Sequence, residues 1–148
     1  MARRSTHQVT VREGTGEKYW YTLAGHAAGT ILAAAYIAWV LSGSPNSSVA
    51  GMFSGVIMLG LAVVSLSIYP ALFKDSAYLR GTRARWKPEW WKYMAGGLGA
   101  PLVVYFAGKA AIWGADVAFA FAVFAFVASS FAVSVSYLYN RHQYVGVP

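Results

Sequence analysis

Four long runs almost free of ionised side chains constrain this sequence more than any other feature. The runs are residues 20–41, 49–73, 93–113 and 116–139. The only charges they hold are Lys109 in the third run and Asp116 at the start of the fourth. A helix rises about 1.5 Å per residue, so about 20 apolar residues cross the hydrocarbon core of a bilayer. The runs therefore predict an all-α integral membrane protein, a four-helix bundle forming a single membrane domain over residues 1–148.

The composition supports this prediction and excludes several classes of protein. Of the 148 residues, 57% are hydrophobic and 11% are charged, whereas soluble domains average about 25% charged residues. An ordinary soluble enzyme and a disordered tail do not fit these values, and the absence of cysteine excludes a disulfide scaffold. The first run is longer than the roughly 7–15 apolar residues of a signal peptide, which predicts a retained helix.

The third run is the least regular of the four. It contains Gly96, Gly97, Gly99 and Pro101, and proline removes a backbone donor and kinks a helix. We expect either a kinked spanning helix or an irregular, re-entrant segment. Gly99 and Pro101 are candidate hinge residues, with a static kink as the alternative interpretation.

The basic residues predict the orientation. Lys and Arg occur in the arm over residues 1–19, in the loop over 74–92 and in the tail over 140–148, whereas the two remaining connections have neither. Because Lys and Arg collect on the cytoplasmic side, we expect a multi-pass protein of the cell membrane with both termini in the cytoplasm. The net charge of +7 then reflects topology and does not indicate nucleic-acid binding.

Small residues predict how the helices pack, because close approach is a main source of helix association in lipid. Two pairs of glycines have the small-xxx-small spacing, and a stripe of small residues follows the fourth run, which favours an intrachain seam over a dimer face. The glycines are Gly25, Gly29, Gly51 and Gly55, and the stripe includes Ala118, Ala122, Ala125 and Ser129.

Three polar residues in or beside the runs are candidates for chemistry, since intramembrane charges are often functional. Lys109 can instead extend to the interface or pair with Asp116. His26 is the only histidine within a run, and one histidine cannot supply both axial ligands of a membrane haem. The sequence therefore does not identify a cofactor. No catalytic motif and no metal-ligand cluster is present, and the sequence leaves open whether the protein is an enzyme.

The loop before the third run combines basic and aromatic residues. Its candidate docking residues are Arg83, Arg85, Trp86, Trp90 and Trp91. Tryptophan favours the headgroup region and Arg favours anionic lipid, so we expect this loop to lie on the anionic inner leaflet. Docking of another protein is the alternative.

The pattern R-x-R-W-x-P-E-W-W-x-Y-x-x-G over residues 83–96, followed by the closing residues 137–148, resembles small multi-pass membrane proteins of haloarchaea. The resemblance covers about half of the chain. It implies a membrane fold and carries over no functional residue. The chain departs from soluble haloarchaeal proteins in having few acidic residues.

Three functions remain open from the sequence. The first is a non-catalytic membrane subunit or scaffold, associated with other membrane subunits or with itself. The second is a small homo-oligomeric transporter or channel that uses Lys109 and His26. The third is a redox subunit that binds haem or quinone through His26.

Overall fold

The computed structural model describes residues 15–43, 47–82, 86–111 and 114–145. Within these residues the protein consists of four helices and contains no strand, which confirms the all-α prediction. The helices are α1 (Thr15–Leu41), α2 (Ser47–Gly81), α3 (Trp90–Ala110) and α4 (Ala115–Tyr144).

Three of these helices are long and apolar enough to cross a membrane. The stretches are Lys18–Leu41 in α1, Ser48–Gly81 in α2 and Ala115–Tyr144 in α4. Many large apolar side chains on them are exposed, among them Leu32, Met52 and Phe119. Apolar surface of this extent has a natural place in lipid rather than in water.

Helix α3 is the exception to the predicted four spans. It forms one continuous helix of 21 residues through Gly99 and Pro101, so the chain here is not irregular. However, it is not among the helices that are apolar enough to span. Its composition explains the difference, because two lysines near its ends, four glycines and a proline make up a third of its 21 residues.

Helix α2 extends further than the sequence predicts. It has 35 residues and continues through Pro70 to Gly81, whereas the second run ends at residue 73. At 1.5 Å per residue its length is about 52 Å, well beyond the roughly 30 Å hydrocarbon core. The extension is held by packing, since Asp75, Ser76 and Leu79 are buried. The predicted loop is correspondingly shorter.

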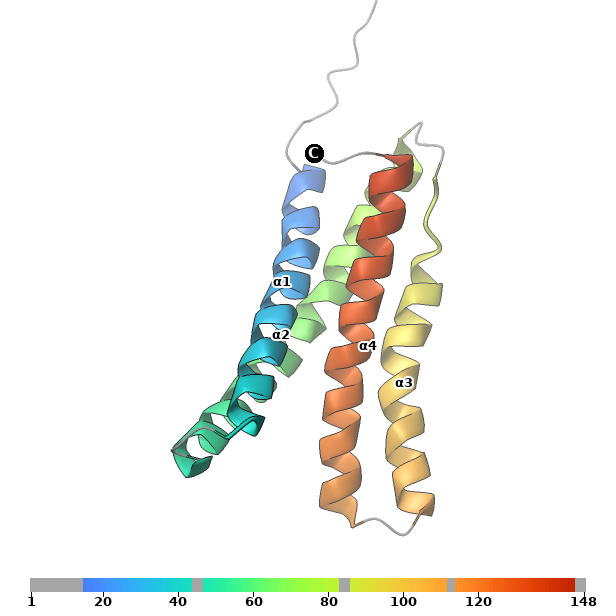
Figure 1. Ribbon diagram of the computed structural model, residues 1–148. Coiled ribbons are helices and arrows are strands. Elements are labelled where there is room, and N and C mark those ends of the chain that lie inside the picture. Colours follow the sequence, from blue (N-terminus) through green and yellow to red (C-terminus); the bar gives the residue numbers. More distant parts are fainter. Residues whose placement is uncertain (1–14, 44–46, 83–85, 112–113, 146–148) are drawn as a thin grey trace, which may run out of the picture.

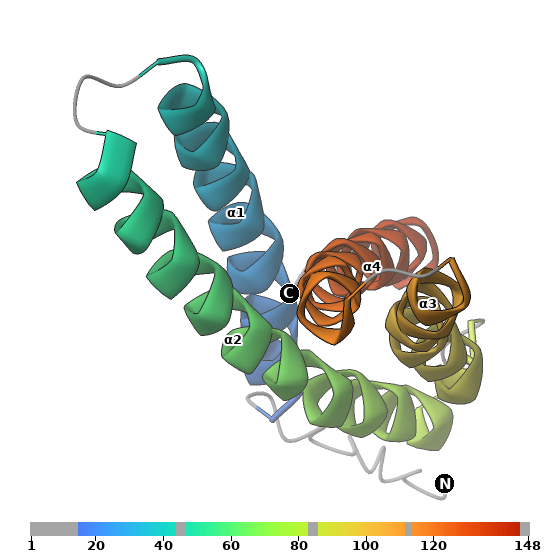
Figure 2. The same ribbon diagram turned by 90° about the horizontal axis from the view of Figure 1, so that it is seen from below.

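The four helices form two antiparallel pairs, α1 with α2 and α3 with α4 (Figure 1). The pairs meet where α1 begins and α4 ends, which we call the closed end. At the other end, which holds Leu41 and Ala115 and which we call the open end, the α1–α2 pair diverges from α3 and α4 (Figures 1 and 2). The start of α1 and the end of α4 thus lie at the same end of the bundle.

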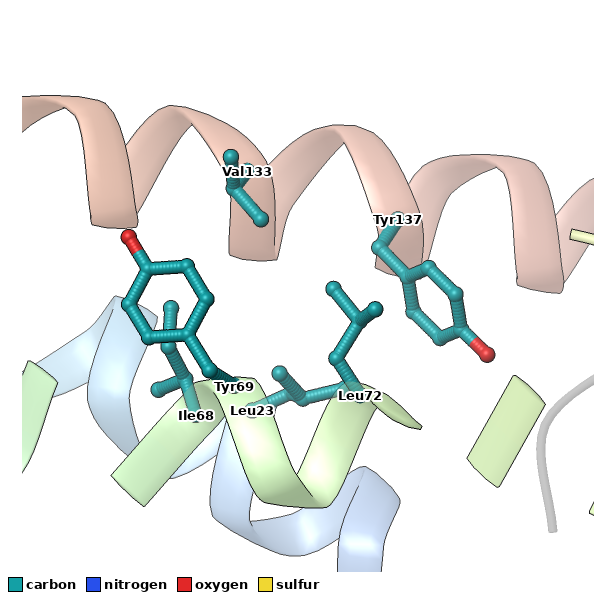
Figure 3. Packing of buried hydrophobic residues seen from close by; sticks show 6 residues of the cluster. All are labelled: Leu23, Ile68, Tyr69, Leu72, Val133 and Tyr137. Atoms are coloured by element: carbon teal, nitrogen blue, oxygen red, sulfur yellow. The ribbon is translucent and has the colours of Figure 1, made fainter. Parts of the chain in front are cut away.

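The core lies toward the closed end, where three helices meet. Leu23 of α1, Leu72 of α2 and Tyr137 of α4 are fully buried there, together with Ile68, Tyr69 and Val133 (Figure 3). Trp86, Trp90 and Tyr93 pack around this cluster. Trp86 of the α2–α3 connection and two aromatic residues of the first turn of α3 therefore contribute to the core.

Candidate functional site

Buried polar side chains form a series of contacts between α1, α2 and α4. Tyr69 of α2 shares a hydrogen bond of 2.9 Å with Ser130 of α4. Beside it, the Ser129 hydroxyl donates to the Gly97 carbonyl of α3, at 2.8 Å. Each of these bonds joins two different helices, and interhelical hydrogen bonds are a main source of specificity when lipid surrounds the helices.

His26 lies in this series, buried between three helices. Its Nε2 is 2.8 Å from the Ser65 hydroxyl of α2, and its Nδ1 is 3.4 Å from the Ser134 hydroxyl of α4. A neutral imidazole has one donor and one acceptor nitrogen, so the two serines can occupy both. The His26 ring thus bridges α1, α2 and α4. A metal ion bound at either ring nitrogen would displace a serine.

A buried ion pair lies at the closed end of the same series. The Asp75 carboxylate of α2 is 0% exposed and Arg141 of α4 is 5% exposed. Arg141 Nε donates to Asp75 Oδ2 at 3.2 Å, and the Tyr137 hydroxyl donates to the same oxygen at 2.7 Å. We call these three residues the polar cluster. Removing one member of a buried pair leaves an uncompensated charge, so the cluster joins α2 and α4 strongly.

Tyr137 and Arg141 both donate to the same oxygen of the Asp75 carboxylate, Oδ2. Asp75 Oδ1 is buried and has no hydrogen-bond partner within the described residues. A buried polar atom without a partner costs about 1–3 kcal/mol and needs an explanation. Among the buried side-chain nitrogen and oxygen atoms of the described residues, it is the one without a hydrogen-bond partner.

Aromatic rings enclose the polar cluster. The Tyr137 ring lies 5.4 Å from Tyr93 and 5.2 Å from Trp86 between centroids. Asn140 donates to the Tyr93 hydroxyl at 3.1 Å, which ties α4 to α3. The first residues of α3 and the segment before it therefore pack against the Tyr137 ring of the polar cluster.

An apolar groove of about 520 Å³ occupies the open end. Twelve residues of α1, α2 and α4 line it, and we call this set the apolar groove. They are Thr30, Ile31, Ala34, Ile37, Ala38, Leu41, Met58, Leu61, Phe124, Val127, Ala128 and Phe131. Thr30 is the only polar residue of the lining, and its hydroxyl donates to the His26 carbonyl at 2.8 Å. The groove surface is therefore almost entirely hydrocarbon.

The candidate pathway residues do not meet. Lys109 is exposed one residue before the end of α3, and Asp116 is exposed in the first turn of α4. His26 contacts Ser134, which is 19 positions beyond Ala115, or about 28 Å along α4 at 1.5 Å per residue. Lys109 therefore lies at the open end, whereas His26 lies well inside the bundle and far from it. Within the described residues no group of three or more His, Cys, Asp and Glu side chains could hold a metal ion.

The predicted docking residues that the structure describes separate into half-buried and exposed ones. Trp86 stacks near Tyr144, and Trp90 meets the Phe73 ring edge-on at 5.1 Å. Trp91 is 54% exposed, with the Lys92 amino group over its ring. Arg83 and Arg85 lie outside the described residues. Of the described tryptophans in this set, Trp91 presents the most surface for lipid or a partner.

The predicted packing residues also differ in their surroundings. In the fourth run Ala118 is buried, Ala122, Ala125 and Ser129 are half-buried, and Ser129 contacts α3 as described above. A side-chain carbon added to any of the four glycines at the small-xxx-small positions would meet no heavy atom within 4 Å. These glycines are Gly25, Gly29, Gly51 and Gly55. A close approach occurs instead at Gly97, where an added carbon would overlap the Tyr69 hydroxyl.

The residues of the polar cluster were not among the sequence-derived candidates. Asp75 and Arg141 belong to predicted cytoplasmic segments, where charges are expected to be solvated. The sequence holds one weak signal for their pairing: an acid lies two positions after the second apolar run, and a base lies two positions after the fourth, which returns to the same side.

Comparisons with known proteins give no relative from which a role can be transferred: the chain matches no protein family, no curated protein and no solved structure.

Proposed function

We propose that the protein is a non-catalytic integral membrane subunit, or scaffold, that binds a transmembrane helix of a partner subunit in its apolar groove. The observation that carries the proposal is the groove itself. Its α1 wall extends from Thr30 to Leu41, which is about 17 Å or three helical turns. Three turns present the i, i+3, i+4 and i+7 side chains by which a helix binds in a groove.

The lining favours an apolar helix as the occupant. Ala34, Ala38 and Ala128 let a second backbone approach closely, and small residues are enriched where transmembrane helices pack. Phe124 and Phe131 form a larger wall on α4. The combination of a small-residue wall and an aromatic wall is suited to the ridges of a helix.

The proposed topology places the protein in the cell membrane, with four spans and both termini in the cytoplasm. It is supported by the bases at the closed end, where Lys74, Arg80, Lys87 and Lys92 are all exposed. Lys109 is the one described base toward the open end. Bases concentrate on the cytoplasmic side and attract anionic lipid, so the closed end would lie at the inner leaflet. Since α3 runs beside α4 (Figure 1), it would cross as part of that pair.

The other two functions receive less support from the geometry. A transport pathway through Lys109 and His26 would have to join two residues that do not meet, and both ring nitrogens of His26 are already bonded to serines. A haem ligated by His26 would have to displace Ser65 or Ser134 from the ring. The subunit function requires neither change.

The direct test is native mass spectrometry of the intact particle extracted gently from its own membrane. We expect a second polypeptide at fixed stoichiometry. Ala34→Phe fills the groove and is expected to lower recovery of that polypeptide at least tenfold. Val103→Phe, at an exposed position on α3, is the matched control and should leave recovery unchanged.

Two results would overturn the proposal. A particle made only of copies of this chain would indicate self-association through the groove or another face. A single chain carrying only lipid would show that the groove holds an acyl chain. Flux across liposomes that Lys109→Ala alters would favour the transporter instead, and visible haem absorbance would favour the redox subunit.

A further inference from the structure

We propose that the Ser129 hydroxyl replaces the backbone donor that Pro101 lacks, and that this bond holds residues 97–101 of α3 as a fixed joint against α4. We call residues 97–101 the joint. The proposal does not rest on the function proposed above. It begins from the position of the proline, which lies inside α3, four residues after Gly97.

The Gly97 carbonyl loses its usual helical partner because of that spacing. In an α-helix the amide of each residue donates to the carbonyl four residues earlier. Proline has no amide hydrogen, and its ring crowds the carbonyl that the hydrogen would have reached. Inside a bilayer no bulk water is present to bond such a carbonyl, so a neighbouring helix or a serine or threonine side chain must do so.

Ser129 of the adjacent helix α4 supplies the missing donor. Its hydroxyl oxygen is 2.8 Å from the Gly97 carbonyl oxygen and 3.1 Å from the Phe126 carbonyl oxygen of its own helix. A hydroxyl has one hydrogen to donate, and the shorter of the two contacts is the one to Gly97. If the joint opens, the hydroxyl can still bond within α4, as serines in helices commonly do. The cost of opening therefore falls on the Gly97 carbonyl.

The joint lies where three helices meet. Gly97 is buried, and a side-chain carbon added there would lie 3.0–3.1 Å from ring carbons of Tyr69 on α2. The Tyr69 hydroxyl in turn shares its 2.9 Å hydrogen bond with Ser130. Two consecutive serines of α4 thus bond to different helices, Ser129 to α3 and Ser130 to α2. The carbonyl that Pro101 leaves without an amide is therefore held within a closely packed contact.

The joint changes the role of the two residues that the sequence indicates as hinge candidates. Gly99 and Pro101 lie inside a helix that stays continuous over 21 residues and that is tied to α4 at Gly97. Helix α3 therefore keeps one shape beside α4, with which it forms an antiparallel pair (Figure 1). Any rearrangement of the bundle then takes place between the two helix pairs and not within α3.

Denaturant unfolding of the full chain in detergent tests whether Ser129 replaces the missing donor. Ser129→Ala should raise the unfolding equilibrium constant about three- to tenfold, as loss of a polar contact between membrane helices does. In the Pro101→Ala background, residue 101 has an amide that can bond the Gly97 carbonyl. There the same Ser129→Ala change should alter the constant less than about twofold. Ser136→Ala, at an exposed position of α4, is the matched control and should have equal, small effects in both backgrounds.

Paired spin labels in lipid vesicles test whether the joint is fixed. The chain has no cysteine, so Ala95→Cys and Ala110→Cys, both at exposed positions of α3, place one label on each side of the joint. The two positions are about 22 Å apart along a straight helix. The distance distribution should be narrow in the otherwise unaltered chain and broader after Ser129→Ala. In the Pro101→Ala background, Ser129→Ala should leave it narrow.

The double variant keeps the test decisive if Ser129→Ala alone fails to fold. Because Pro101→Ala restores an amide to α3, the chain that carries both changes should fold again. Three results would overturn the proposal. They are equal effects of Ser129→Ala on unfolding in the two backgrounds, a distance distribution that Ser129→Ala leaves unchanged while Pro101 is present, and a double variant that folds no better than Ser129→Ala.

Discussion

The closed end and the open end of the bundle hold the same helices by different means. At the closed end, α2 and α4 are joined by the Asp75–Arg141 ion pair and by the Tyr137 hydroxyl. At the open end, α1, α2 and α4 line an apolar groove and share no hydrogen bond among its lining side chains.

The two ends differ in how strongly their contacts determine the arrangement of the helices. Lipid tails are as apolar as leucine, so lipid or another helix can replace an apolar contact between helices at little cost. A buried ion pair or hydrogen bond has no such replacement. We therefore expect the closed end to determine the fold and the open end to tolerate change, and four substitutions of decreasing effect examine that expectation.

The largest effect is expected where the ion pair is broken. Arg141→Met leaves the Asp75 carboxylate buried without its cation, which should lower the free energy of unfolding by about 3–5 kcal/mol. Denaturant titration in detergent, followed by circular dichroism, measures the loss. Lys92→Met is the control, because its pair with Glu89 is largely exposed and worth less than about 1 kcal/mol. Equal losses in both variants would show that the buried pair does not dominate the closed end.

The next effect concerns the close approach of α2 and α3. Gly97→Ala places a carbon against the Tyr69 ring, whose hydroxyl is held by Ser130. Overpacking of this kind should cost about 1–3 kcal/mol. Gly96→Ala in the same helix meets nothing within 4 Å and should be neutral or slightly stabilising. The same titration distinguishes them, and a neutral Gly97→Ala would mean that Tyr69 moves aside freely.

A smaller effect is expected at the histidine bridge. Ser65→Ala removes the 2.8 Å partner of His26 Nε2, and polar contacts between membrane helices are worth about 0.6 kcal/mol on average, up to about 1.7. Ser67→Ala, two residues further along α2, loses a bond only to the Val64 carbonyl of its own helix. Ser65→Ala should therefore unfold at a lower temperature than Ser67→Ala. Identical midpoints would show that the bond between His26 and Ser65 does not stabilise the bundle.

The smallest effect belongs to the open end. Ala34→Leu adds bulk in the groove, and the stability of the isolated chain should change by less than about 0.5 kcal/mol. The adjacent Ala33 is buried, so Ala33→Leu should cost about 1–3 kcal/mol. If thermal unfolding shows the reverse order, the groove is filled by the chain itself and is not an open surface.

The sequence was sufficient to predict the broad architecture but not the details of packing. Long uncharged runs impose helices in lipid, because every backbone group there must bond within its own segment. The same runs do not mark where a helix stops in the interfacial region. The extension of α2 to Gly81 depends on tertiary burial of Asp75 and Leu79, which local composition does not encode.

The candidate sites were still harder to derive from sequence. Spacing rules identify residues on one helix face, as with Gly25 and Gly29, but cannot say which face meets a neighbour. The close approach at Gly97 depends on where the Tyr69 side chain points. The pairing of Asp75 with Arg141 joins residues 66 positions apart, and local patterns carry no information about contacts at that separation.

That separation also sets an order of events during synthesis. A ribosome delivers α2, and with it Asp75, well before it reaches Arg141 near the end of α4. Until then the carboxylate has no cation from α4. That end of α2 must therefore stay in water or in contact with the proteins that insert the chain into the membrane. A chain interrupted before Arg141 would carry all four hydrophobic runs and yet lack the countercharge that completes them. The ion pair can thus form only after nearly all of α4 has been synthesised.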